Sequence, residues 1–186
     1  MKESCQTALK EWSIIVRALL EGRQMLLLRK GGIRETLREF TVEEDEFFLF
    51  PTFEHQHPGG VREPFQGWLK GLPAQTPQIL SIDTYVTVEK VFQLGDPQQV
   101  TGLSSYHIYS NEQILERFRY KPAKPLYLVL LRSYRLPAVS IQNLPSYAGC
   151  RSWVPLEAPL STRSAVPVMP DAVFQEKARE ILKLLS

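Results

Sequence analysis

A stretch of basic and aromatic side chains, residues 117–151, has the residue types best suited to binding a ligand. It holds no Asp or Glu, and its members are Arg117, Arg119, Lys121, Lys124, Arg132, Arg135 and Arg151, with Phe118, Tyr120, Tyr127, Tyr134 and Tyr147. Arginine pairs with two phosphate oxygens at once, and flat rings stack on bases. The stretch therefore predicts binding of nucleic acid or a nucleotide. The alternative is that these residues are the solvated ends of a buried strand and its core tyrosines.

Acidic side chains gather earlier, within residues 35–46, where the basic residue is Arg38. Three of them are spaced four apart: Glu35, Glu39 and Glu43. A helix would place these three on one face, where they could hold Mg²⁺ for phosphoryl chemistry. The segment could instead be extended, because β-formers lie at residues 40–42. A solvated acidic surface is the other interpretation.

Two of the three histidines lie in the run Glu54-His55-Gln56-His57. A metal site there would need an extended backbone, because only then do His55 and His57 point the same way. Glu54 or His55 could also act as a general base near neutral pH. Otherwise this is a loop whose histidines bond to backbone or water. We assign no metal ligand from the sequence, and the cofactor stays unknown.

Composition describes an ordinary globular protein of 186 residues, 44% hydrophobic and 23% charged, with net charge +2. That length suits one domain, residues 1–186. No apolar run is long enough to span a bilayer, and the first residues lack the apolar core of a signal peptide. Two cysteines, Cys5 and Cys150, do not make a disulfide framework. We expect a cytoplasmic protein without a membrane partner; a protein partner and the oligomeric state stay open.

Hydrophobic patterns predict an α+β fold with a mixed or mostly antiparallel sheet of six or seven strands and three or four short helices. Alternation over residues 12–20 and an apolar run at 24–29 predict a β-hairpin. Continuous apolar runs at 47–50 and 126–131 predict buried strands, and residues 79–94 a long strand.

Two helices have start signals in the sequence. Ser110, followed three residues later by Gln113, predicts a helix over 111–119. Asp171 is a good N-cap for a last helix, whose apolar stripe of Phe174, Ala178 and Ile181 should close over the sheet.

Five phrases together resemble a bacterial family, frequent in cyanobacteria, that is described as a domain of unknown function. They are ALKEW at 8–12, LLRKGGIRE at 27–35, LFPTFEHQ at 49–56, RFRYKP at 117–122 and GCRSWV at 149–154. The resemblance runs across nearly the whole chain. Some family members carry a restriction-endonuclease-like domain, which implies a link to restriction–modification or DNA processing.

The resemblance selects a set of residues to test: Arg29, Lys30, Arg34, Glu35, Glu54, His55, Arg117, Arg151 and Trp153. Their functional interpretation is an anion-binding cleft. Their structural interpretation is a buried salt-bridge network that joins Arg29 or Arg151 to Glu35 or Glu54.

Three functions follow as hypotheses. The first is a nucleic-acid- or nucleotide-binding module whose ligand contacts come from Arg29, Lys30, Arg34, Arg117, Arg119, Lys121, Arg151 and Trp153. The second is a small metal-dependent phosphohydrolase or nuclease whose catalytic residues are Glu35, Glu54 and His55. The third is a structural or protein-interaction domain without a small ligand. Whether the protein is an enzyme is left open.

Overall fold

A seven-stranded sheet is the framework of the protein. The computed structural model describes residues 1–30, 34–36, 39–41, 44–149 and 151–185, with the backbone alone given at 34–36 and 39–41. The strand order is β2-β7-β6-β5-β1-β8, with β9 beside β7. The strands are β1 Ser4–Trp12, β2 Leu26–Arg29, β5 Glu46–Thr52, β6 Ile79–Leu94, β7 Leu126–Gln142, β8 Trp153–Ser161 and β9 Val166–Pro167. Among these strands β1 and β5 run parallel, and the other pairs are antiparallel.

Five α-helices accompany the sheet in the described residues: α1 Ser13–Leu20, α2 Glu63–Gln66, α3 Pro97–Thr101, α4 Asn111–Arg119 and α5 Asp171–Leu185. The Ser110 hydroxyl accepts the Gln113 N–H at 3.0 Å and so begins α4 where the sequence predicts. The α+β class and the mostly antiparallel sheet are confirmed. Within the described part of the chain, no helix is long and apolar enough to cross a membrane.

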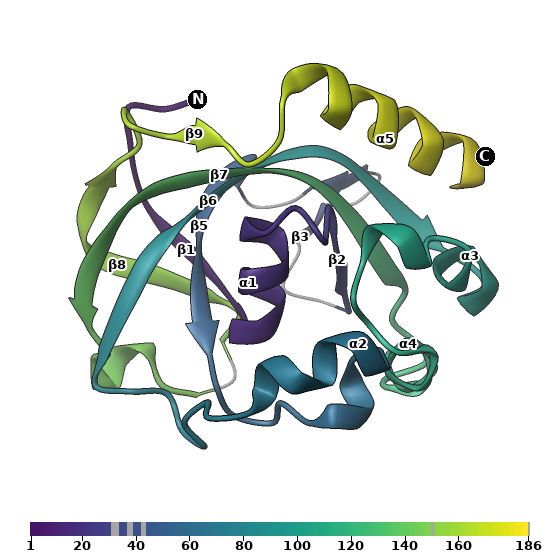
Figure 1. The fold of residues 1–186 in the computed structure, drawn as a ribbon, viewed down its shortest axis with the longest axis horizontal. Helices are drawn as coiled ribbons and strands as arrows, with labels where there is room; N and C mark the ends of the chain where they lie inside the picture. The colour runs from purple at the N-terminus through teal and green to yellow at the C-terminus, as the bar shows by residue number, and fades with distance from the viewer. Residues whose placement is uncertain (31–33, 37–38, 42–43, 150, 186) are drawn as a thin grey trace.

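Both faces of the sheet are covered by buried side chains. Successive side chains of a strand point to opposite faces, so they enter different clusters. On β5, Phe47 and Leu49 enter one buried cluster, while Phe48 and Phe50 enter another. The first cluster lies on the side of the helices and includes α1, α3, α4 and α5. Figure 1 shows α1 near the centre of the molecule, with β1, β5 and β8 on one side and α2, α3 and α4 on the other, while the long strands β6 and β7 curve over α1 between the two sides.

The prediction of a strand over residues 12–20 is wrong. Strand β1 ends at Trp12, and the next eight residues form the helix α1. The helix packs among sheet and helices, so Ile14, Ile15, Val16, Ala18 and Leu19 are all buried. A helix buried on nearly every side is apolar nearly all round, and a subset of its side chains then mimics the alternation of a strand.

The segment of the three spaced glutamates is not helical where it is described. Strands β3, Arg34–Thr36, and β4, Glu39–Thr41, pair as an antiparallel hairpin in which Glu35 lies opposite Phe40. The shared helical face that a magnesium site would need is therefore missing for Glu35 and Glu39, and Glu43 lies outside the described residues. The extended alternative is correct at residues 39–41.

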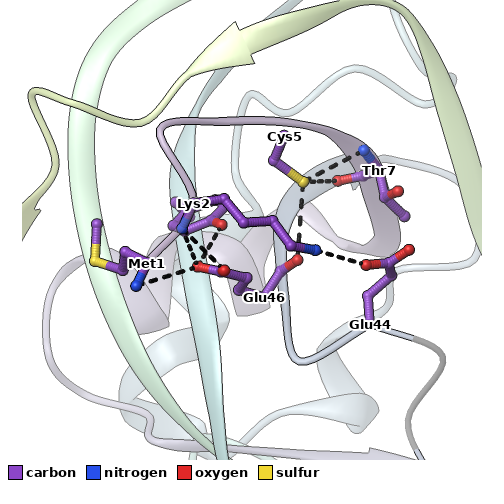
Figure 2. A network of polar contacts seen from close by, with 7 residues as sticks. Met1, Lys2, Cys5, Thr7, Glu44 and Glu46 are labelled. Atoms are coloured by element: carbon purple, nitrogen blue, oxygen red, sulfur yellow. Dashed lines mark hydrogen bonds and ion pairs between the residues drawn. The ribbon is translucent and has the colours of Figure 1, made fainter.

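A polar network ties the start of β1 to β5 at the edge where β5 begins (Figure 2). The Glu46 carboxylate accepts the Lys2 backbone N–H at 2.9 and 3.0 Å and the Tyr85 hydroxyl at 2.8 Å. The Lys2 ammonium reaches Glu44 at 3.0 Å. Part of the acidic cluster thus serves to hold strands together, and burial next to Glu46 raises the pKa of Tyr85.

The third histidine, His107, is a core residue. Its Nε2 lies 3.1 Å from the Val100 carbonyl oxygen, and the residue is 1% exposed. Burial lowers the pKa of His107 to about 4, against the upward effect of the bond to Val100. The imidazole is therefore neutral in the folded protein at physiological pH.

This burial predicts acid destabilisation. An unfolded histidine titrates near pH ~6.5, so the unfolded chain binds a proton first as the pH falls. The stability linked to neutral His107 is present above that pH and is lost between about pH 6.5 and 4, by up to about 3 kcal/mol. Urea unfolding of the wild type and of His107→Gln between pH 7 and 4 measures this. Parallel pH profiles for the two proteins would contradict it.

Candidate functional site

A cavity of about 720 Å³ opens at one edge of the sheet. Because β1 and β5 are parallel, both end at this edge, with Trp12 paired to Thr52. Strand β8 runs antiparallel to β1, so the residues just before it, Arg151 and Ser152, reach the same edge. Helix α4 contributes Arg117, and the loop after β7 contributes Tyr147. The cavity therefore combines segments from both halves of the chain.

The lining is rich in positive charge. Four cationic side chains line the cavity together with two carboxylates: Lys10, Arg29, Arg117 and Arg151, with Glu11 and Glu54. The rings of Trp12, Phe50 and Tyr147 also line it. Cationic and aromatic groups in one concave surface suit anions that carry flat rings.

Arg29 is neutralised within the protein. Its Nη1 lies 3.2 Å from the Glu11 Oε2, and the two side chains are 14% and 3% exposed. The same nitrogen donates to the Lys10 carbonyl at 3.2 Å, and Glu11 Oε1 accepts the Trp12 N–H at 3.0 Å. The sequence suggested Glu35 or Glu54 as partner for Arg29; among described side chains the partner is Glu11. This pair fixes the end of β1.

Arg117 lies against aromatic rings. Its guanidinium is 5.0 Å from the centre of the Tyr109 ring and 5.8 Å from that of Trp12, and Nη1 donates to the Leu28 carbonyl. Within the described residues its buried Nε has no hydrogen-bond partner. Burial and then the charge of Glu11 raise the pKa of Tyr109 to about 12, so its hydroxyl stays protonated beneath this cluster.

Lys10 holds the loop that closes one side of the cavity. Its ammonium donates to the carbonyl oxygens of Tyr147 and, at 3.0 Å, Gly149. The Tyr147 ring packs edge-on against Phe50 with centroids 5.7 Å apart, and its hydroxyl accepts the Glu157 N–H at 2.9 Å. Lys10 is therefore a positioning charge that donates to two backbone carbonyl oxygens of this loop.

Arg151 differs from the other three cations. It is exposed, and it makes no hydrogen bond or ion pair with any residue that the structure describes. Its guanidinium retains its donors at the mouth of the cavity. The ion pair of Arg151 with Glu54, which the salt-bridge interpretation allowed, is not formed; the Glu54 carboxylate accepts hydrogen bonds from Thr76 and Phe53 instead.

The turn at residues 53–57 is held by its own polar contacts. Glu54 accepts the Thr76 N–H and the Thr76 hydroxyl, each at 2.7 Å, and Gln56 Oε1 accepts the Ile14 N–H at the start of α1 at 3.0 Å. Partial burial raises the pKa of Glu54, but the bonds from Thr76 outweigh it and the net direction is down. A carboxylate so bonded is a weak base, although its catalytic role stays a prediction.

His55 and His57 do not share a face. His55 is exposed and takes a left-handed backbone conformation with φ 63°. The His57 ring packs against Trp12 with centroids 5.8 Å apart. The extended backbone that a two-histidine metal site would need is interrupted at His55. Across the described ranges, no group of three or more His, Cys, Asp or Glu could hold a metal ion.

The structure thus gathers Arg29, Glu54, His55, Arg117 and Arg151 around one cavity. Four other predicted residues lie outside its lining: Lys30, Arg119, Lys121 and Trp153. The Lys30 ammonium donates a hydrogen bond to the Phe118 carbonyl oxygen, and the Lys121 ammonium lies 5.0 Å from the centre of the Tyr120 ring. The Trp153 ring packs edge-on against Phe47, with centroids 4.9 Å apart. The side chains of Arg34 and Glu35 fall outside the described part.

Sequence reasoning missed Lys10, Glu11 and Trp12 as cavity residues. A signal was present, because Lys10 and Glu11 directly follow the apolar pair Ala8-Leu9, and charged side chains next to a buried strand call for partners. Because a strand was predicted to begin at residue 12, the end of β1 at Trp12 was missed.

Residues 8–180 match a family model described as a domain of unknown function, DUF1802. The chain belongs to the DUF1802 family. This confirms the resemblance to a domain of unknown function that the sequence phrases indicated.

No curated protein matches this DUF1802 chain. Among solved structures it is similar to the crystal structure of ASCH from Zymomonas mobilis, with a TM-score of 0.43 and 12% identity over 97% of this chain and 95% of that one. A mutant form of the same protein gives a TM-score of 0.44 and 13% identity over the full length of both chains. TM-scores and identities this low carry no weight for function.

Proposed function

We propose that this DUF1802 protein binds nucleic acid or a nucleotide in the cavity at the edge of the sheet. The observation that carries the proposal is Arg151, an exposed guanidinium with no bond to the described residues, at the mouth of an aromatic-lined cavity. Arg117 also lines the cavity, and its Nε has no hydrogen-bond partner among the described residues. Two arginines at one cavity can contact the oxygens of a phosphate, and Trp12 offers a ring to a base.

Within this proposal each side chain has a role. Arg151 contacts phosphate at the mouth, and Arg117 contributes positive charge further inside. Lys10 and the Arg29–Glu11 pair position the walls. The family resemblance supports a role together with restriction or DNA-processing enzymes. We expect that role in the cytoplasm, where the buried free thiol of Cys5 would stay reduced.

Arg151→Ala is expected to weaken the binding of a short fluorescent single-stranded oligonucleotide about ten- to a hundredfold, because one charge-assisted phosphate contact is worth roughly 1.5–3 kcal/mol. The slope of log affinity against log salt concentration should become shallower by about the amount that one phosphate contact contributes. Fluorescence anisotropy at several salt concentrations measures both quantities.

Arg119→Ala is the matched control, since Arg119 is an exposed arginine on α4 outside the cavity lining. It should leave affinity within about twofold. Equal losses in the two variants would place binding elsewhere on the surface. No binding by the wild type, together with a co-purifying protein, would favour the protein-interaction function.

A further inference from the structure

A second groove, of about 700 Å³, adjoins the cavity. It lies between the turn at residues 53–58 and the segment 66–74, and His55 lines both hollows. Most of its wall is apolar, with Phe53, Pro58, Leu69, Leu72 and Pro73. The cavity and the groove are therefore adjacent, and the exposed residue His55 lies at their common border.

The chemistry of the two halves differs. The cavity lining combines four cations with two carboxylates, whereas the one charged residue among the described groove lining is Lys70. Leu72 remains 36% exposed, and Phe53 and Leu69 are half-buried. An apolar groove beside a cationic cavity, without an acidic residue in its described lining, suits a ligand with an anionic part and an adjoining flat apolar part.

We propose that the groove takes a base next to the nucleotide held in the cavity, so that the ligand is an unpaired strand of two or more nucleotides. This inference rests on the proposed function. Phosphate of the strand lies at Arg151, its backbone passes His55, and the neighbouring base lies on Phe53 and Leu69. In a duplex the base faces are stacked and covered, so a single strand alone offers them to an apolar wall.

Gly67 permits a clean test, because it lines the groove and a Cβ added there would meet nothing within 4 Å. Its φ of −60° suits any residue. Gly67→Glu therefore adds a carboxylate at the groove lining, and its Cβ meets no neighbouring atom within 4 Å. Gly95→Glu is the charge-matched control, since a Cβ at Gly95 also meets nothing within 4 Å and Gly95 lies outside both linings.

Binding of a thymidine mononucleotide, a single-stranded hexathymidylate and a hairpin duplex is measured at one salt concentration for both variants and the wild type. The wild type is expected to bind the hexamer at least about tenfold more tightly than the mononucleotide, because a base contact adds to the phosphate contact. Gly67→Glu should lose this advantage, whereas Gly95→Glu should keep it. Mononucleotide affinity should agree among all three proteins within about twofold, because the mononucleotide does not reach the groove.

Equal hexamer affinity in Gly67→Glu and Gly95→Glu would overturn the groove as a base site. Duplex binding as tight as hexamer binding would overturn the unpaired strand as the ligand. Failure of the wild type to bind any of the three probes would overturn the proposed function itself, which is a different result. Matching thermal melts of the two variants confirm that the comparison concerns folded protein, and Leu72→Ser, at an exposed groove position, provides a second variant with the same expected loss.

Discussion

Replacing Arg29 by methionine is expected to lower the free energy of unfolding by about 3–5 kcal/mol. Methionine keeps much of the volume but leaves the Glu11 carboxylate, 3% exposed, without its ionic partner 3.2 Å away. The other Glu11 oxygen accepts a hydrogen bond only from the backbone of Trp12 among described groups. An unpaired buried charge is the costly outcome, since its desolvation is no longer offset. Urea denaturation at pH 7 measures the change.

Two controls separate this effect from a general loss of charge. Arg163→Met breaks the exposed pair with Glu3, whose side chains are 71% and 77% exposed, and should cost under about 1 kcal/mol. The double variant Glu11→Gln with Arg29→Met removes both charges and should recover much of the loss. A loss in Arg29→Met no greater than in Arg163→Met would show that Glu11 is not held by Arg29.

Phe50→Ala should cost a similar amount, about 3–5 kcal/mol, because it deletes a ring that is 1% exposed. The ring packs against Tyr147, whose carbonyl accepts a bond from Lys10. Loss of that wall should therefore also loosen the loop beside the cavity and weaken oligonucleotide binding. Chemical denaturation and anisotropy on the same samples measure the two effects.

Phe92→Ala is the control for Phe50→Ala, since Phe92 is a half-buried phenylalanine on β6 outside the cavity lining. It should cost less in stability and leave affinity unchanged at temperatures where the protein is folded. If Phe50→Ala destabilises the protein without altering affinity, Tyr147 does not shape the binding surface.

The candidate site was partly predictable from the sequence. Arg117 and Arg151 stand out because they belong to a basic stretch without acidic residues. That both line one cavity was not predictable, because it depends on where α4 and the start of β8 lie relative to the end of β1. Arg119 and Lys121 belong to the same basic stretch. They lie outside the cavity lining, because packing and not position in the sequence decides which residues reach the cavity.

The sequence by itself determined the elements whose signals are local. Helix α4 follows from the cap at Ser110, and the buried part of β7 follows from a continuous apolar run, because capping and side-chain burial are settled within a few residues. Tertiary structure alone decided that residues 13–20 form a buried helix and that Arg29 pairs with Glu11. An apolar segment fits either a strand or an enclosed helix, and an ion pair depends on distances in space, so both are set by packing between segments far apart in the chain.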